Sequence, residues 1–259
     1  MKTNMLILAF LRRKVVKVSS LPTHTIRKGQ QLYRVLTAEY DQNGNRLYDA
    51  LEPNPYTYVT FDEKSDVKAR FEDNTLVSGR FTPFRSSKAE HEAVPALYFA
   101  ESAIGAYYEI ILRPLGNKAK RAIELADVEN KVLARVILNK NLKLADIRRP
   151  YLKGGQKPFW EYTAEDLYES SNLKVIKETR SLSKYVHDNY PELDGLIWDS
   201  VQAQGPVTCM ILFGFRRTGR IEEEIEVLSD ISTWRPYLLE GVRNGEIIVA
   251  PDLVNILEL

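Results

Sequence analysis

The chain has very little cysteine and histidine, and this scarcity narrows the chemistry open to it. Its 259 residues include one cysteine and three histidines. Because Cys209 is the single cysteine, the chain cannot form an intramolecular disulfide. The apolar residues around it, from Val207 to Phe213, predict a buried structural thiol. The histidines have no HExxH or CxxC neighbourhood, so we expect no metal site built from protein ligands. His187 falls inside a predicted surface helix and is expected to be exposed.

Long apolar segments are also missing. The sequence opens on a run of about six apolar residues that is followed directly by Arg12, Arg13 and Lys14. A signal peptide needs a longer apolar stretch with a small-residue cleavage site, and a membrane span needs about 20 apolar residues. We therefore expect a cytoplasmic protein without membrane contact.

An excess of charge of one sign is absent as well. Lys and Arg number 36 against 35 Asp and Glu, so the net charge of +1 gives no bulk attraction to nucleic acid or anionic lipid. The GxxxxGK[ST], GxGxxG and GxSxG motifs are missing, which removes the local chemistry of P-loop, Rossmann and α/β-hydrolase proteins. With 44% hydrophobic residues, the composition is that of an ordinary globular protein.

What the sequence does contain is a mixture of short strands and helices without regular alternation. Strands are predicted at residues 31–36, 96–100, 132–138, 141–146, 193–199 and 207–213. Ser102 is predicted to cap a helix whose apolar stripe runs to Ile111; a short helix is expected at Thr163, and another from Arg180 to Tyr190. This mixture predicts an α+β or irregular α/β fold.

Four separated fragments carry a resemblance to a known family. They are Leu32-Tyr-Arg34, Gly79-Arg80-Phe81, Leu97-Tyr98-Phe-Ala-Glu-Ser102 with Ala106 and Glu109, and Leu193-Asp-Gly-Leu-Ile-Trp-Asp-Ser200. In this order, with eleven positions from Tyr98 to Glu109, the chain resembles the RES domain family over residues 31 to 215. It departs from the family where Phe81-Thr82 follow the second arginine, a place where Trp-Asn is typical.

The resemblance implies a fold and an activity. The fold would be α+β, an ADP-ribosyltransferase-like mixed sheet with flanking helices. The activity would cleave the nicotinamide–ribose bond of NAD, as a phosphorylase or a glycohydrolase, and would be toxin-like. NAD would be a substrate rather than a bound cofactor, with inorganic phosphate as a candidate co-substrate. An antitoxin or other inhibitor protein and a second copy in a homodimer are the candidate partners.

The same resemblance divides the chain into parts. Residues 1–30 would be an N-terminal lead-in, and residues 31–215 the catalytic domain, with a loop-rich insert at about 41–75. Residues 216–259 would form an extension packed on that domain.

The matched residue types suit the implied chemistry. Breaking the N-glycosidic bond builds positive charge on the ribose, which a carboxylate such as Glu109 stabilises. Arg34 and Arg80 are suited to bind the pyrophosphate, since guanidinium groups bind phosphate in bidentate fashion. Tyr98 would stack on the nicotinamide or bond a ribose hydroxyl, and Ser200 would hold phosphate or position the acceptor. Glu109, Arg34 and Ser200 are thus the predicted catalytic group, with Arg34, Arg80, Tyr98 and Ser200 binding NAD.

Plainer interpretations stay open at this stage. Tyr98 suits a core position, Glu109 an exposed helix face and Ser200 a turn or cap. For the chain as a whole, the alternatives are an ADP-ribosyltransferase with a macromolecular target and a non-catalytic module that binds a nucleotide or a partner.

Overall fold

The structure is a computed structural model, and part of the chain lies outside its description. It describes residues 21–38, 40–45, 51, 80–82, 84–87, 89–109, 121–129, 131–148, 173–200, 207–213, 221–228, 231–243 and 247–258. Most of the predicted insert, the helix expected at Thr163 and the end of the helix expected to reach Ile111 lie outside these residues.

An eight-stranded mixed sheet forms the centre of the molecule. Its order is β1-β8-β9-β10-β5-β2-β7-β11, and all neighbours are antiparallel except the parallel pair β8 and β9. The strands are β1 (Thr23–Ile26), β2 (Gln31–Thr37), β5 (Ala96–Ala100), β7 (Lys131–Leu138), β8 (Leu142–Asp146), β9 (Gly195–Asp199), β10 (Thr208–Phe213) and β11 (Ile221–Leu228). Together with the helices, this sheet confirms the predicted α+β class.

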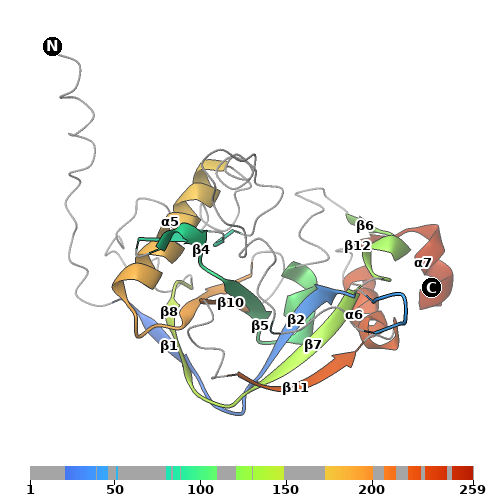
Figure 1. Cartoon of the computed structure of the whole chain (residues 1–259). Helices are drawn as coiled ribbons and strands as arrows, with labels where there is room; N and C mark the ends of the chain where they lie inside the picture. The colour runs from blue at the N-terminus through green and yellow to red at the C-terminus, as the bar shows by residue number, and fades with distance from the viewer. Residues whose placement is uncertain are drawn as a thin grey trace, which may run out of the picture.

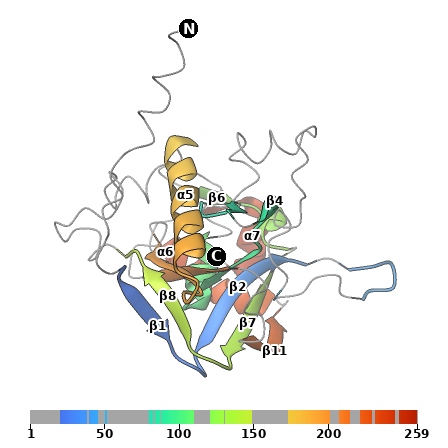
Figure 2. The same ribbon diagram turned by 60° about the vertical axis from the view of Figure 1, so that its left-hand side comes forward.

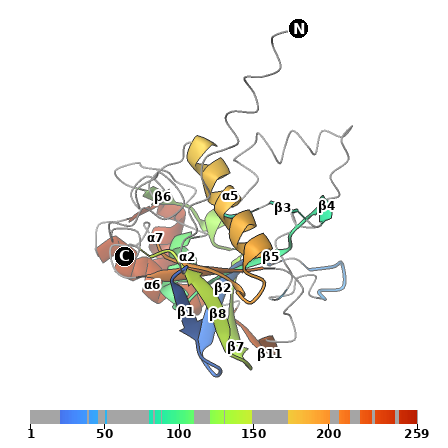
Figure 3. The ribbon, with the colours of Figure 1, turned by 90° about the vertical axis from the view of Figure 1, so that its left-hand side faces the viewer.

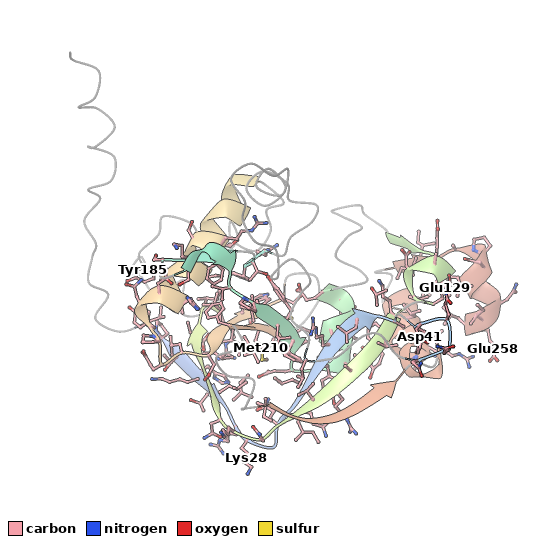
Figure 4. All side chains as sticks on the ribbon, viewed as in Figure 1. Lys28, Asp41, Glu129, Tyr185, Met210 and Glu258 are labelled. Atoms are coloured by element: carbon pink, nitrogen blue, oxygen red, sulfur yellow. The ribbon has the colours of Figure 1, made fainter. Side chains whose placement is uncertain are left out.

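The sheet is bent into two arms. Figures 1 and 2 show β1 and β8 in one arm and β2 and β7 in the other, converging at one end. Pairing between β2 and β5 is limited to Tyr33 opposite Ala100, whereas β2 pairs with β7 over its whole length. The arms are tied together where the Lys28 backbone N–H donates to Asn141 Oδ1 at 2.8 Å, and Figure 4 labels Lys28 at this point.

Two apolar clusters occupy the two faces of the sheet, as the alternation of side chains along a strand requires. In β10, Met210 and Leu212 belong to one cluster, while Cys209, Ile211 and Phe213 belong to the other. The first cluster joins side chains from both arms. The second includes buried residues of the helices and carries the candidate site.

The helices and small strands surround this sheet. They are β3 (Arg85–Ser86), β4 (Ala89–Ala93), α2 (Ala103–Tyr107), β6 (Arg121–Ile123), the 3₁₀ turn η5 (Leu125–Asp127), α5 (Leu173–Asn189), α6 (Ile231–Arg243), β12 (Ile247–Val249) and α7 (Pro251–Leu257). Figure 3 shows β3 and β4 beside α5, whereas α6, α7, β6 and β12 gather at the other side of the molecule in Figure 1. In the described residues, no helix is long and apolar enough to cross a membrane.

Each predicted strand corresponds to an observed one, and the helix cap is confirmed because Ser102 Oγ accepts a hydrogen bond from the Gly105 N–H at 3.2 Å. Cys209 is buried, as expected. The sheet extends past the predicted domain limits at both ends, because β1 lies within the lead-in 1–30 and β11 within the extension 216–259. The helix expected to begin at Arg180 begins at Leu173.

The prediction that His187 is exposed is wrong. Its side chain is buried, with the residue only 8% exposed. The rings of Phe84 and Phe213 pack edge-on against it, at centroid distances of 5.6 and 5.7 Å. His187 is buried because the segment before β4 and the sheet both cover the side of α5 on which it lies.

Candidate active site

Helix α2 sets the position of Glu109. The helix follows directly on β5, and the described chain continues through Tyr108 and Glu109 in a π-helical turn, a feature frequent at functional sites. Gly105 allows close packing, since a Cβ at this position would lie 2.5 Å from Val207 Cγ1. Glu109 comes four residues after Gly105 and so lies on about the same side of the helix, facing the neighbourhood of Val207.

Ser200 completes the pair. It follows β9 and is 5% exposed, and its backbone N–H donates to the Val207 carbonyl at 2.7 Å. Its side-chain hydroxyl donates to Glu109 Oε1 at 2.6 Å, although the two residues are 91 positions apart. At this length it is a well-formed hydrogen bond between a hydroxyl and a carboxyl oxygen. The structure therefore brings the predicted Glu109 and Ser200 together.

Tyr98 holds the segment that follows Arg80. Its hydroxyl accepts the Phe81 backbone N–H at 3.2 Å and lies 2.9 Å from Thr82 Oγ1, in a hydrogen bond that either hydroxyl can donate. Its ring meets Trp198 edge-on at a centroid distance of 6.1 Å. Because Trp198 precedes Ser200 by two residues, this contact connects Tyr98 to the strand that positions the serine.

Helix α5 also holds the segment that begins at Arg80. We name residues 80–82 and 84–87 of this segment the strap. At one end, the Thr179 hydroxyl donates to the Arg80 carbonyl at 2.5 Å. At the other, Asp188 accepts from Ser86 Oγ at 3.1 Å, from Ser87 Oγ at 2.7 Å and from the Ser87 N–H at 3.0 Å. Arg80 is thus fixed through its backbone between α5 and Tyr98.

The carboxyl group of Asp188 is held ionised by these contacts. Burial acts to raise its pKa, but the hydrogen bonds from Ser87, His187 and Ser86 outweigh burial and hold the pKa well below its ordinary value. His187 Nδ1 lies 3.0 Å and Lys184 Nζ 3.4 Å from its oxygens. The last turns of α5 therefore anchor the strap with a partly buried, charged acceptor.

Arg180 is a residue of this region that the sequence analysis missed. It is only 9% exposed and follows Thr179 on α5. Burial lowers the pKa of its guanidinium, and interaction with Tyr98 acts in the opposite direction. Helical spacing places Arg180, Ser183 and His187 on one side of α5, but that this side is buried is seen in the structure alone.

Arg34 lies differently from the other predicted residues. Strand alternation places it on the side of β2 that carries Leu32, which belongs to the first apolar cluster. Tyr33 and Tyr98 pack against the second cluster, on the other face. The role of Arg34 in binding NAD or in catalysis stays a prediction.

The part of the chain that the structure describes contains no group of three His, Cys, Asp or Glu side chains placed to hold a metal ion. The polar side chains of the region are the Ser200–Glu109 pair, the Tyr98–Thr82 pair and two arginines, Arg80 and Arg180. These groups come from β9, α2, β5, the strap and α5, which are distant in sequence.

Comparison with known proteins identifies the family. The model of the RES domain matches residues 46–235, which is well over half of the chain. The match includes Arg80, Tyr98, Glu109 and Ser200, whereas Arg34 precedes it. No curated protein and no solved structure matched the chain. By the extent of the family match, the chain belongs to the RES domain family.

Proposed function

We propose that this protein is an NAD-consuming enzyme that cleaves the bond between nicotinamide and ribose. The observation that carries the proposal is the 2.6 Å hydrogen bond from Ser200 to Glu109. It joins two residues of widely separated family motifs, and it gives a carboxylate a fixed orientation beside an aromatic and basic region. Membership of the RES domain family supports the same activity.

In this reaction the protein itself takes little part in making and breaking covalent bonds. In NAD the nicotinamide nitrogen is cationic, so the electron pair of the breaking C1′–N bond leaves with neutral nicotinamide. Positive charge develops on the ribose, and the Glu109 carboxylate stabilises it or holds a ribose hydroxyl. An oxygen of water or of inorganic phosphate forms the new bond to C1′ and, in the case of water, releases a proton to solvent.

Ser200 and Tyr98 have separate roles in this scheme. Ser200 orients the carboxylate, since its hydroxyl proton is committed to Glu109 Oε1. The Tyr98 hydroxyl is engaged by Phe81 and Thr82, which leaves the ring as the surface offered to nicotinamide. Arg80, whose backbone is held by Thr179, supplies a guanidinium for the pyrophosphate.

The test is incubation of the purified protein with NAD, with and without inorganic phosphate, followed by chromatography with mass detection. Release of nicotinamide with phosphorylated ADP-ribose would identify a phosphorylase, and release with plain ADP-ribose a hydrolase. Folded protein that releases no nicotinamide under either condition contradicts the proposal. A toxin-like role would follow from the same activity; a fall in cellular NAD on expression, absent with Glu109→Ala, tests it.

A further inference from the structure

Arg180 is a charged residue in a buried place. It lies on α5 and is 9% exposed, next to Tyr98 and one residue after Thr179. Taking a guanidinium out of water is costly, so buried arginines are found where an anion binds them or where their planar geometry is used.

A second observation is the position of Arg180 relative to Arg80. The hydroxyl of Thr179 donates to the carbonyl of Arg80 at 2.5 Å, so the two arginines occupy neighbouring places on α5 and the strap. The hydroxyl of Tyr98, a group that acts to raise the pKa of Arg180, is bonded to the two residues that follow Arg80. The backbone of Arg80 and the side chain of Arg180 thus lie in the surroundings of one tyrosine, although they come from two segments distant in sequence.

The chemistry of two arginines differs from that of one. A guanidinium binds a phosphate group through two parallel N–H donors, and the bond is stronger where water is partly excluded. Burial lowers the pKa of Arg180, which means that its charge is less well solvated than that of a surface arginine, and an arriving anion recovers more of that loss. A pyrophosphate, with two adjacent charged groups, is the ligand that such a pair would fit.

We propose that Arg180 binds the pyrophosphate of the dinucleotide together with Arg80, as a second anion-binding residue of the site. The inference rests on the proposed function, because it assigns a substrate contact within the same site. It adds a residue from α5, and it gives the Thr179–Arg80 bond a purpose, namely to hold the two guanidinium-bearing residues next to each other.

The experiment compares Arg180→Gln with a matched control, Arg27→Gln. Arg27 is an exposed arginine in the turn between β1 and β2, so the control removes the same charge from the surface. Calorimetry measures binding of ADP-ribose, which keeps the pyrophosphate and lacks the scissile bond. We expect Arg180→Gln to weaken binding by about 10- to 100-fold, the range for hydrogen bonds to charged groups, and Arg27→Gln to bind like the wild type.

Kinetics provides a second reading. The KM for NAD should rise in Arg180→Gln while kcat changes much less, because the phosphate contact is remote from the breaking bond. Arg180→Lys should bind ADP-ribose with intermediate affinity, since it keeps the charge and loses the planar fork. This variant also serves if Arg180→Gln does not fold.

The outcomes separate the inference from the proposed function. If the wild type releases nicotinamide while folded Arg180→Gln and Arg180→Lys bind ADP-ribose as tightly as it does, the inference is overturned and the enzymatic function stands. If the wild type releases no nicotinamide, the proposed function fails irrespective of the variants. A loss of affinity in Arg180→Gln matched by an equal loss in Arg27→Gln would also overturn the inference, because it would show a general charge effect.

Discussion

At the scale of single residues, the site depends on one hydrogen bond between side chains that the sequence places far apart. In the proposed reaction, Glu109 supplies the negative charge and Ser200 fixes the orientation of its carboxylate. On this proposal, replacing the carboxylate would remove the stabilisation of the cationic ribose, whereas replacing the serine would leave the charge in place and free the carboxylate to rotate. The two substitutions should therefore differ in severity.

The first prediction compares these two variants. Glu109→Gln should lower kcat for nicotinamide release by about 100- to 1000-fold, the range for losing one electrostatic contact to a transition state. Ser200→Ala should cost about 10- to 100-fold, the worth of a hydrogen bond to a charged group. The exposed Glu129, labelled in Figure 4, gives a matched control, and Glu129→Gln should keep full activity. Equal kcat in Glu109→Gln and the wild type would remove the carboxylate from the mechanism.

The second prediction concerns the anchor of the strap, Asp188. The pKa of its carboxyl is lowered in the folded protein, so its contribution to stability is present above the unfolded pKa and is lost as the pH falls through the folded pKa. Asp188→Asn should lower the free energy of unfolding by about 1.5–3 kcal/mol at pH 7. The difference from the wild type should shrink below about pH 4, where the unfolded carboxyl begins to bind protons.

Urea unfolding at a series of pH values measures this difference. A gap between Asp188→Asn and the wild type that stays constant from neutral to acid pH would show that the hydrogen bonds of Asp188 do not depend on its ionisation. Lys184 is the nearby cation, and it is half-exposed, so its pairing with Asp188 contributes little at moderate salt.

At the scale of elements, α2 must lie close to Val207, the residue that precedes β10. The third prediction tests this approach with Gly105→Ala. In an ordinary helix this change would stabilise by about 0.5–1 kcal/mol. Here the new Cβ would meet Val207 Cγ1 at 2.5 Å and Ala100 Cβ at 3.1 Å, and overpacking costs about 1–3 kcal/mol, so destabilisation should prevail. Displacing α2 should also lengthen the Ser200–Glu109 bond and lower kcat.

A double-mutant cycle with Val207→Ala checks the mechanism of that loss. Val207→Ala opens space opposite Gly105, so the double variant should recover part of the stability and of the activity that Gly105→Ala loses. Strict additivity of the two substitutions, in both unfolding free energy and kcat, would argue that the helix does not depend on this contact.

Elements whose hydrophobic pattern was strong could be predicted from the sequence, and weakly patterned ones could not. The central strands β5, β9 and β10 are apolar runs and were found, as was the capping serine of α2. The edge strands β1 and β11 read Thr-His-Thr-Ile and Ile-Glu-Glu-Glu-Ile-Glu-Val-Leu, sequences whose polar residues resemble those of a surface segment. Each pairs on one side only within the sheet, and long-range pairing places it there.

The candidate site shows the same division. Family motifs identified Glu109 and Ser200, and the structure adds the bond between them, which depends on how β9 and α2 pack and on no local pattern. Arg180 and His187 were missed because a helix sequence rich in polar residues does not reveal which of its sides tertiary packing will bury.

At the scale of the whole molecule, the end of the family match does not coincide with the end of the packed structure. The match stops at residue 235, within α6. Beyond it, the ring of Tyr237 packs on Tyr107 of α2 at a centroid distance of 5.0 Å. Strand β12 pairs with β6 in parallel, and the Asp252 carboxylate accepts the Leu125 N–H at 3.0 Å. Through Tyr237, α6 thus packs on the helix that positions Glu109, while β12 and α7 contact β6 and η5.

The fourth prediction asks whether these elements unfold together with the sheet. Leu253 of α7 is fully buried, and Leu253→Ala should lower the free energy of unfolding by about 2–5 kcal/mol, a large part of the roughly 5–15 kcal/mol of a typical domain. Ile248 of the adjacent β12 is 46% exposed and serves as the control, with an expected change within about 0.5 kcal/mol for Ile248→Ala. Circular dichroism and nicotinamide release, both followed against temperature, measure the effect.

The two probes distinguish one cooperative unit from two. If the Tyr107–Tyr237 contact couples α6 and α7 to α2, Leu253→Ala should lower the midpoints of structure and of activity by the same amount, in a single transition. A separate early transition that leaves activity unchanged would mean that the C-terminal elements fold independently of the site. The coupled outcome would place residues outside the family match among those that keep Glu109 in position.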